Sequence, residues 1–210
     1  MQAWARINGG AGRRFSVHVD TALEADAPGA EVNAAREVAT LLLGLPWELL
    51  HDDDGYLFQG AKPTRVRRRL PNTGVYDVPV VATPIRILLV TARPEDEACG
   101  YLDHRASALP LVEALEALPG LVKLWVLNPP TLPALRKELD RARSENKPYH
   151  VVHFDGHGVY DRYAGLGGLC FELPEDTGKL ERRRHATIYT NELGPLLRDH
   201  RIPLVFLEAC

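Results

Sequence analysis

The feature that most constrains the fold is the alternation of strand-like and helix-like segments that begins at residue 85. Ile85-Arg-Ile-Leu-Leu-Val90 is an apolar run of strand length, residues 109–118 carry leucines at helical spacing, and residues 121–127 form a second apolar run. The pattern continues with further helices and strands, expected at 131–146, 150–154, 169–172, 190–197 and 204–208. Strands that are connected through helices run parallel and are covered on both faces. The sequence therefore predicts an α/β fold with a mostly parallel sheet.

Residues 1–82 are expected to form a separate N-terminal part, because proline, glycine and asparagine crowd the connector at residues 71–84. Within this part the patterns predict a strand, a helix, a short amphipathic turn and a basic strand, at 14–20, 31–43, 45–52 and 65–70. The basic strand, Arg65-Val-Arg-Arg-Arg-Leu70, lacks interleaved aromatic side chains. We interpret it as a solvated edge or a set of ion pairs rather than a nucleic-acid surface. Residues 83–210 form the second, larger part.

The composition predicts a soluble globular protein of the cytoplasm. Apolar residues make up 45% and charged residues 25% of the 210 residues, and 25 Lys and Arg against 28 Asp and Glu give a net charge of −3. This balance gives no reason to expect a nucleic-acid or membrane partner. The first residues lack the apolar segment of a signal peptide, and no apolar stretch is long enough to span a bilayer. Three cysteines without a CxxC motif argue against a disulfide framework or a zinc knuckle.

Chemically reactive residues follow two of the predicted strands. The strand at 150–154 continues into Asp155-Gly-His-Gly158, and the strand at 204–208 continues into Cys210. Ligands bind outside the carboxyl ends of strands in such sheets, and a thiol beside an imidazole can form a nucleophile and its acid–base partner. The two glycines that flank His157 indicate a sharp backbone turn that brings an N–H group close to a ligand. Cys210 could instead be a small buried side chain and His157 a histidine in a turn, and residue types alone favour that interpretation.

Six longer motifs occur in order along the chain. They are Leu45-Pro-Trp-Glu-Leu-Leu-His-Asp-Asp-Asp-Gly55, Val66-Arg-Arg-Arg-Leu70, Ile85-Arg-Ile-Leu-Leu-Val-Thr-Ala-Arg-Pro94, Tyr149-His-Val-Val-His-Phe154, His153-Phe-Asp-Gly-His-Gly158 and Leu204-Val-Phe-Leu-Glu-Ala-Cys210. Together they resemble the CHAT family of caspase-like cysteine peptidases, over most of the chain from about residue 40 to the end. The ordered set of motifs makes the catalytic interpretation of the histidine and the cysteine the favoured one.

What the resemblance implies is a caspase/separase-type three-layer αβα sandwich that hydrolyses peptide bonds with a Cys–His dyad. Cys210 matches the family's nucleophile, and His157 matches its acid–base residue. Gly158 matches the position whose backbone N–H forms an oxyanion hole with the N–H of the cysteine. His153 also belongs to the family pattern, but it lies inside the predicted strand and we interpret it as structural. No metal and no organic cofactor is expected.

Two acidic residues bear on the choice of substrate. Asp155 lies two positions before His157, and Glu208 lies two positions before Cys210. In metacaspases, which are relatives by this resemblance, the corresponding positions line the pocket for P1, the residue before the scissile bond. Two carboxylates there would form charge-assisted hydrogen bonds with a Lys or Arg at P1. The alternative, which stays open, is that Glu208 pairs with a neighbouring arginine and Asp155 caps a turn.

The sequence given ends at Cys210, whereas the family pattern continues with a helix and further strands. We therefore expect a fragment that is truncated after the cysteine strand, with an exposed sheet edge and little activity of its own. CHAT domains commonly follow TPR or other repeat domains, and residues 1–40 contain no such repeat. The expected partners are a protein substrate and an upstream repeat domain of the complete protein. The alternative function is a non-catalytic, caspase-like scaffold module in a bacterial signalling or defence complex.

Three other segments carry glycine or polar residues, and for each a structural role is favoured. Gly165-Leu-Gly-Gly168 lacks the spacing of a nucleotide-binding loop and is expected to form the bend of a hairpin. Asp96, Asp103 and His104 follow the first strand of the larger part, where a solvated loop is favoured over a metal or substrate site. Residues 181–185 form a polar stretch between predicted elements. Such loops are sometimes cleaved when caspase-like peptidases are activated, and the three arginines here would suit an enzyme that prefers a basic P1 residue.

Overall fold

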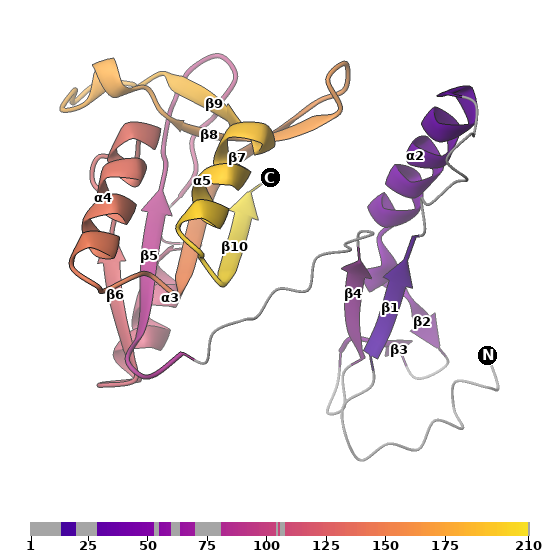
Figure 1. Cartoon of the computed structure of the whole chain (residues 1–210), viewed down its shortest axis with the longest axis horizontal. Coiled ribbons are helices and arrows are strands. Elements are labelled where there is room, and N and C mark those ends of the chain that lie inside the picture. Colours follow the sequence, from indigo (N-terminus) through magenta and orange to yellow (C-terminus); the bar gives the residue numbers. More distant parts are fainter. Residues whose placement is uncertain are drawn as a thin grey trace. The chain divides into compact units, whose positions relative to one another are not determined.

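The computed structural model describes residues 14–19, 29–52, 55–59, 64–69, 81–103, 105 and 108–209. The chain divides into two compact units, residues 1–77 and 78–210, which we describe separately (Figure 1). Cys210 and His104, as well as most of the proline-rich connector, lie outside the described residues. No helix in the described part of the chain is long and apolar enough to cross a membrane.

The N-terminal unit is a small α/β assembly. Its elements are β1 (Arg14–His18), α2 (Gly29–Gly44), the 3-10 helix η1 (Trp47–Leu49), β2 (His51–Asp52), β3 (Gly55–Tyr56) and β4 (Arg65–Arg69). Strands β1 and β4 pair in parallel, and β2 and β3 form a short antiparallel pair. The core consists of Val17, Val19 and Ala39, against which Leu43 and Trp47 pack. The apolar alternation of β1 and the helical spacing of α2 thus meet in one core.

Arg68 connects the basic strand β4 to the turn that follows α2. Its guanidinium donates hydrogen bonds to the carbonyl oxygens of Leu43 at 2.6 Å and Leu45 at 2.8 Å. It also forms a bidentate ion pair with Glu48, in which Nη2 and Oε2 are 2.7 Å apart. This hydrogen bonding lowers the pKa of Glu48 from 4.5 to about 2. Arg68 therefore belongs to an ion pair, which is one of the two roles expected for the basic run.

We expect Arg68→Ala to lower the free energy of unfolding of this unit by about 1 kcal/mol, because the pair is partly exposed and screened by solvent. The contribution of Glu48 is fully present above its ordinary pKa of 4.5 and is lost as the pH falls through about 2. Denaturant unfolding of the chain at several pH values measures the difference. Arg67→Ala, which removes an exposed arginine from the same strand, is the matched control. Equal losses in the two variants would contradict the assignment.

The C-terminal unit is an α/β sandwich around a six-stranded mixed sheet. Its strands are β5 (Ile85–Thr91), β6 (Val122–Val126), β7 (Val151–Asp161), β8 (Leu166–Glu172), β9 (His185–Tyr189) and β10 (Leu204–Ala209). Its helices are α3 (Ala108–Glu116), α4 (Leu132–Ser144), α5 (Thr190–Asp199) and the 3-10 helix η2 (Pro174–Asp176). The sheet order is β6-β5-β7-β8-β9, with β10 paired to β7. Helices α4 and α5 cover one face of the sheet and α3 the other (Figure 1), which confirms the predicted α/β fold class.

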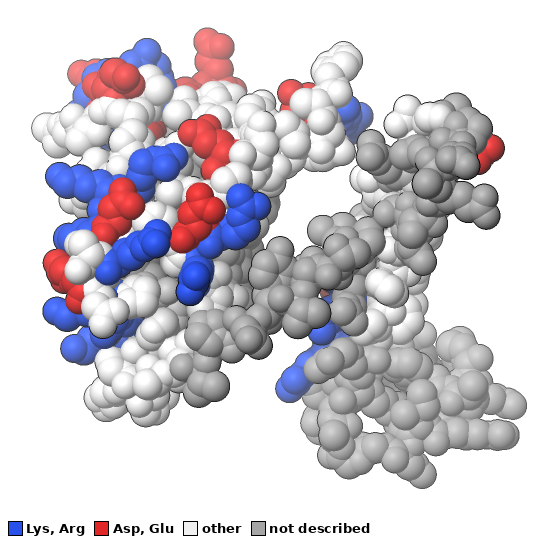
Figure 2. Space-filling view, in the orientation of Figure 1, with Lys and Arg blue, Asp and Glu red and all other residues white. Residues whose placement is uncertain are grey.

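Helix α4 shows how the sequence pattern determines packing. Thr131 caps its N-terminus, where the side-chain oxygen accepts a hydrogen bond from the backbone N–H of Ala134 at 3.4 Å. Leu135, Leu139 and Ala142 recur at helical spacing and are buried in the core that the helix shares with the sheet. The outer surface of the helix carries ion pairs, and Figure 2 shows acidic and basic side chains interspersed on this face of the unit.

One predicted strand is longer in the structure than expected, and one strand was not predicted at all. The strand predicted at 150–154 does not end at Phe154 but continues through Asp155-Gly-His-Gly158 to Asp161. Up to Gly156 it pairs in parallel with β5 and β10, and from His157 onward it pairs antiparallel with β8. The glycines that flank His157 therefore lie in extended strand and not in a sharp turn. Strand β9 was not predicted, because its sequence begins in a polar stretch and has only five residues.

Gly156 is required for close packing rather than for backbone rotation. A Cβ atom at this position would lie 3.0 Å from the carbonyl oxygen of Ala92 and 3.0 Å from two ring carbons of Phe154. We expect Gly156→Ala to lower the free energy of unfolding by about 1–3 kcal/mol, as overpacking does elsewhere. Gly167→Ala is the matched control, since its Cβ would meet only a methyl group of Thr190 at 3.8 Å. Thermal unfolding compares the two variants, and equal stability would contradict the packing argument.

Candidate active site

His157 is held by a backbone carbonyl group of a distant loop. It lies in β7, partly buried, and its Nε2 is 2.8 Å from the carbonyl oxygen of Gly100, in the segment between β5 and α3. A carbonyl oxygen can only accept a hydrogen bond, so Nε2 carries the proton in this contact. In the neutral ring, Nδ1 then holds the lone pair and can accept a proton from a thiol. Gly100 therefore sets both the tautomer and the orientation of the imidazole.

Strand β10 brings the last described residues of the chain next to His157. In the parallel ladder between β10 and β7, Glu208 is the partner of Asp155 and Ala209 is the partner of Gly156. The contact continues beyond this register, because a Cβ atom on Gly158 would lie 3.3 Å from Cβ of Ala209. The structure thus brings together Asp155, His157 and Gly158 on one strand and Glu208 on its neighbour. Cys210, which follows Ala209 in the sequence, lies outside the described residues.

Asp155 is buried and paired with Arg93. Its side chain is 4% exposed, and that of Arg93, which follows β5, is 15% exposed. The guanidinium donates to the Asp155 carboxylate through Nη2 and to the Asp155 carbonyl oxygen through Nη1 at 2.7 Å. Nη1 also lies 3.0 Å from the carbonyl oxygen of Ala92. Asp155 lies within a strand and forms an ion pair with Arg93 inside the protein.

Glu208 differs from Asp155 in its exposure. Its side chain is 48% exposed, and its Oε2 lies 3.4 Å from Nε2 of His153. His153 is 7% exposed inside β7, and its ring packs on Phe206 with the centroids 4.7 Å apart. The partner of Glu208 among the described residues is thus a histidine rather than an arginine. The exposed part of the Glu208 carboxylate can accept hydrogen bonds from a cationic ligand.

The two aspartates in the segment after β5, Asp96 and Asp103, have different roles. Asp103 bonds within its own turn, where its Oδ1 accepts a hydrogen bond from the backbone N–H of Arg105 at 3.0 Å. Asp96 instead binds His185 at the start of β9, with 2.6 Å between Oδ2 and Nδ1. A solvated loop therefore describes the surroundings of Asp103, but not those of Asp96.

Sequence analysis missed two groups of this site, Arg93 and Gly100. A signal for Arg93 was available, since a basic residue directly after a buried strand lies at the sheet edge where the acidic residues gather. No side-chain pattern could have identified Gly100, because it contributes only a backbone carbonyl group.

Comparison with known proteins gives one informative result. No curated protein matches the chain. The family model described as CHAT domain matches residues 36–210, which include most of α2, the Arg68–Glu48 pair and the whole C-terminal sheet. This family is caspase-like. The match covers far more than half of the sequence, and the chain belongs to the CHAT domain family.

Proposed function

We propose that this protein is a caspase-like cysteine endopeptidase with Cys210 as nucleophile and His157 as acid–base residue. The observation that carries the proposal is the hydrogen bond from His157 Nε2 to Gly100, which leaves Nδ1 for a proton from a thiol. The ladder that pairs Ala209 with Gly156 supports it, because the residue before Cys210 lies beside the residue before His157. Membership of the CHAT family adds a caspase-like precedent.

In the proposed reaction, the Cys210 thiol gives its proton to His157 and the resulting thiolate attacks the carbonyl carbon of the scissile bond. The negative charge that develops on the carbonyl oxygen is stabilised by the backbone N–H groups of Gly158 and Cys210. The imidazolium then donates its proton to the leaving amine as the C–N bond breaks, which leaves a thioester on Cys210. Water, deprotonated by His157, hydrolyses the thioester and restores the thiol.

The proposed substrate preference is a Lys or Arg at P1, with Glu208 as the principal recognition residue. Its carboxylate is about half exposed, so it can meet a cationic side chain at little desolvation cost. Asp155 is engaged by Arg93. We assign it a supporting role, in which its buried charge adds to the negative potential of the pocket while Arg93 limits that contribution.

Glu208→Gln should reduce the preference for Arg over Leu at P1 by about 10–100-fold, the usual effect of losing a hydrogen bond to a charged group. The readout is the ratio of kcat/KM for two peptides that differ only at P1. Glu192→Gln, which changes an exposed residue of α5, is the control and should leave the ratio unchanged. An unaltered ratio in Glu208→Gln would remove this residue from the specificity pocket.

The direct test of function is cleavage of a peptide library varied at P1. The protein should contain whatever sequence follows Cys210 in its natural reading frame and any repeat domain that precedes residue 1. Cleavage after Arg or Lys supports the proposal. If the folded protein cleaves no peptide, with its natural upstream domain and trigger present, the scaffold function in a bacterial signalling or defence complex becomes the better explanation.

The proposed partners are a protein substrate and an upstream repeat domain, and the proposed location is the cytoplasm. Cys99 and Cys170 are buried free thiols, and a reducing compartment keeps thiols in that state.

A further inference from the structure

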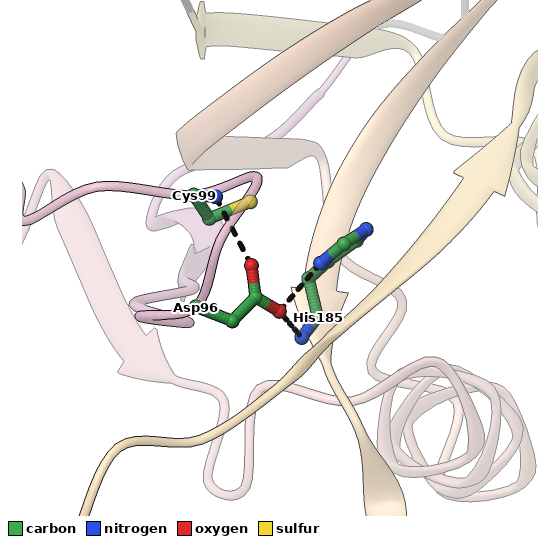
Figure 3. A group of neighbouring side chains, drawn as sticks. All are labelled: Asp96, Cys99 and His185. Atoms are coloured by element: carbon green, nitrogen blue, oxygen red, sulfur yellow. Dashed lines mark hydrogen bonds and ion pairs between the residues drawn. The ribbon is translucent and has the colours of Figure 1, made fainter.

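Three residues with metal-binding side chains meet outside the Cys–His site. Asp96 and Cys99 come from the segment after β5, and His185 is the first residue of β9 (Figure 3). One potential ligand atom from each residue lies within 4.8 Å of the other two. Cys99 is 1% exposed, and the side chains of Asp96 and His185 are 19% and 28% exposed. The cluster is therefore shielded around the thiol and open to solvent on the imidazole side.

The carboxylate of Asp96 is held in a fixed orientation. Its Oδ2 accepts hydrogen bonds from the backbone N–H and from Nδ1 of His185, at 2.8 Å and 2.6 Å. Its Oδ1 accepts hydrogen bonds from the backbone N–H groups of Ala98 and Cys99, at 3.0 Å and 3.1 Å. In Figure 3 the Nδ1 edge of the His185 imidazole faces the Asp96 carboxylate, and the Cys99 thiol projects from the loop that carries Asp96. The polypeptide thus positions the three side chains before any ligand is bound.

We propose that Asp96, Cys99 and His185 form a binding site for a thiophilic divalent cation of the Zn²⁺ class. Thiolate, imidazole and carboxylate are the donors that Zn²⁺ uses in proteins, and three protein ligands leave the fourth tetrahedral position for water. Two of the ligands are three residues apart in one loop and the third comes from a strand, so the cation would join the two segments.

The charges of the three ligands match a divalent cation. A divalent cation would supply the positive charge that a thiolate needs there, and Zn²⁺ with one thiolate and one carboxylate is neutral overall. On binding, the Cys99 thiol loses its proton to solvent. The proton on Nδ1 of the neutral His185 ring moves to Nε2, so that Nδ1 can bind the cation and the imidazole stays neutral.

Coordination requires the contact between His185 and Asp96 to open. Two ligand atoms bonded to one tetrahedral Zn²⁺ at about 2.0–2.1 Å are about 3.3 Å apart. The contact of 2.6 Å between His185 Nδ1 and Asp96 Oδ2 must therefore open by roughly 0.7 Å, as the cation takes the place of the proton. Since β9 begins at His185, a rotation of its side chain leaves most of the strand in place.

The test uses Co²⁺ as a spectroscopic substitute for Zn²⁺. The whole chain carries Cys210→Ala, so that this site is measured without the candidate nucleophile and independently of the proposed function. We expect one equivalent of Co²⁺ to produce a thiolate-to-metal absorption band and tetrahedral d–d bands, and Zn²⁺ to displace the Co²⁺. Cys99→Ser should abolish the thiolate band, and His185→Gln should weaken binding by at least about tenfold.

Matched controls separate this site from other thiols and imidazoles. Cys170→Ser removes the other buried cysteine and His51→Gln removes an exposed histidine of the N-terminal unit, and both should keep the thiolate band. Circular dichroism checks that each variant is folded. A second measurement needs no variant at this site, since Zn²⁺ added near neutral pH should release about one proton per site, from the Cys99 thiol. A folded protein that gives no thiolate band, or a band that survives Cys99→Ser, would overturn the proposal.

Discussion

Cys210→Ala is expected to lower the rate of peptide cleavage by about 10⁴–10⁶-fold, the loss that follows removal of a nucleophile that acts together with its base. His157→Ala should cause a loss of similar size, and the double variant should lose little more, because the two residues act as a unit. The measurement is kcat for one Arg-P1 peptide in the three variants and the wild type. Substantial cleavage by Cys210→Ala would show that another residue is the nucleophile. Losses that add up in the double variant would show that Cys210 and His157 do not act as a unit.

Thiol labelling tests the same pair without a turnover assay. Cys99 and Cys170 are 1% and 0% exposed, so an electrophile has little access to either thiol. Burial also raises the pKa of the Cys99 thiol to about 12, so few thiolates form at Cys99 at neutral pH. An Arg-directed electrophile should therefore label Cys210 selectively. His157→Ala should slow this labelling by about 10²–10⁴-fold. Equal labelling of all three cysteines in the native protein would contradict an activated Cys210.

Arg93→Met is expected to lower the free energy of unfolding by about 3–5 kcal/mol, because it leaves the buried carboxylate of Asp155 without its cation. The two side chains are 15% and 4% exposed, so solvent can replace little of the lost interaction. The double variant Arg93→Met/Asp155→Asn should recover much of the stability, since no charge then remains buried without a partner.

Denaturant unfolding of the single and double variants measures this coupling. Arg136→Met, at a surface position of α4, is the matched control and should change stability by less than about 0.5 kcal/mol. If Arg93→Met were as stable as this control, the Arg93–Asp155 pair would contribute little to the stability of the fold.

Most of the central fold could be predicted from local periodicity. The apolar run that forms β5 and the spacing of Leu135 and Leu139 in α4 indicate their structures without tertiary information. The second half of β7 could not be predicted in this way. Asp155, Gly156 and Gly158 are poor strand formers, and they are extended because neighbouring strands supply the ladder partners.

In the candidate site, too, some residues could be predicted from the sequence and others depend on the tertiary structure. Asp155, His157, Gly158 and Glu208 were identified from motifs, and the parallel pairing of β7 and β10 places them on neighbouring strands. The partner of Asp155 was not identified, because Arg93 is 62 residues away in sequence and its guanidinium reaches the carboxylate only after the sheet has formed. Side chains with distinctive chemistry can be recognised in a sequence, whereas their ion-pair partners depend on register and burial.

The division of β7 between two ladders has a consequence for local opening of the protein. Amide groups before His157 are protected by the parallel strands β5 and β10, whereas those from His157 onward depend on the antiparallel strand β8. Hydrogen exchange should therefore separate the two halves of this one strand into different cooperative units. Because His157 is the first residue of the second half and pairs with the buried Cys170, its backbone is released only when β8 separates from β7. Under the proposed function, such a local separation on heating would abolish peptide cleavage before the whole protein unfolds.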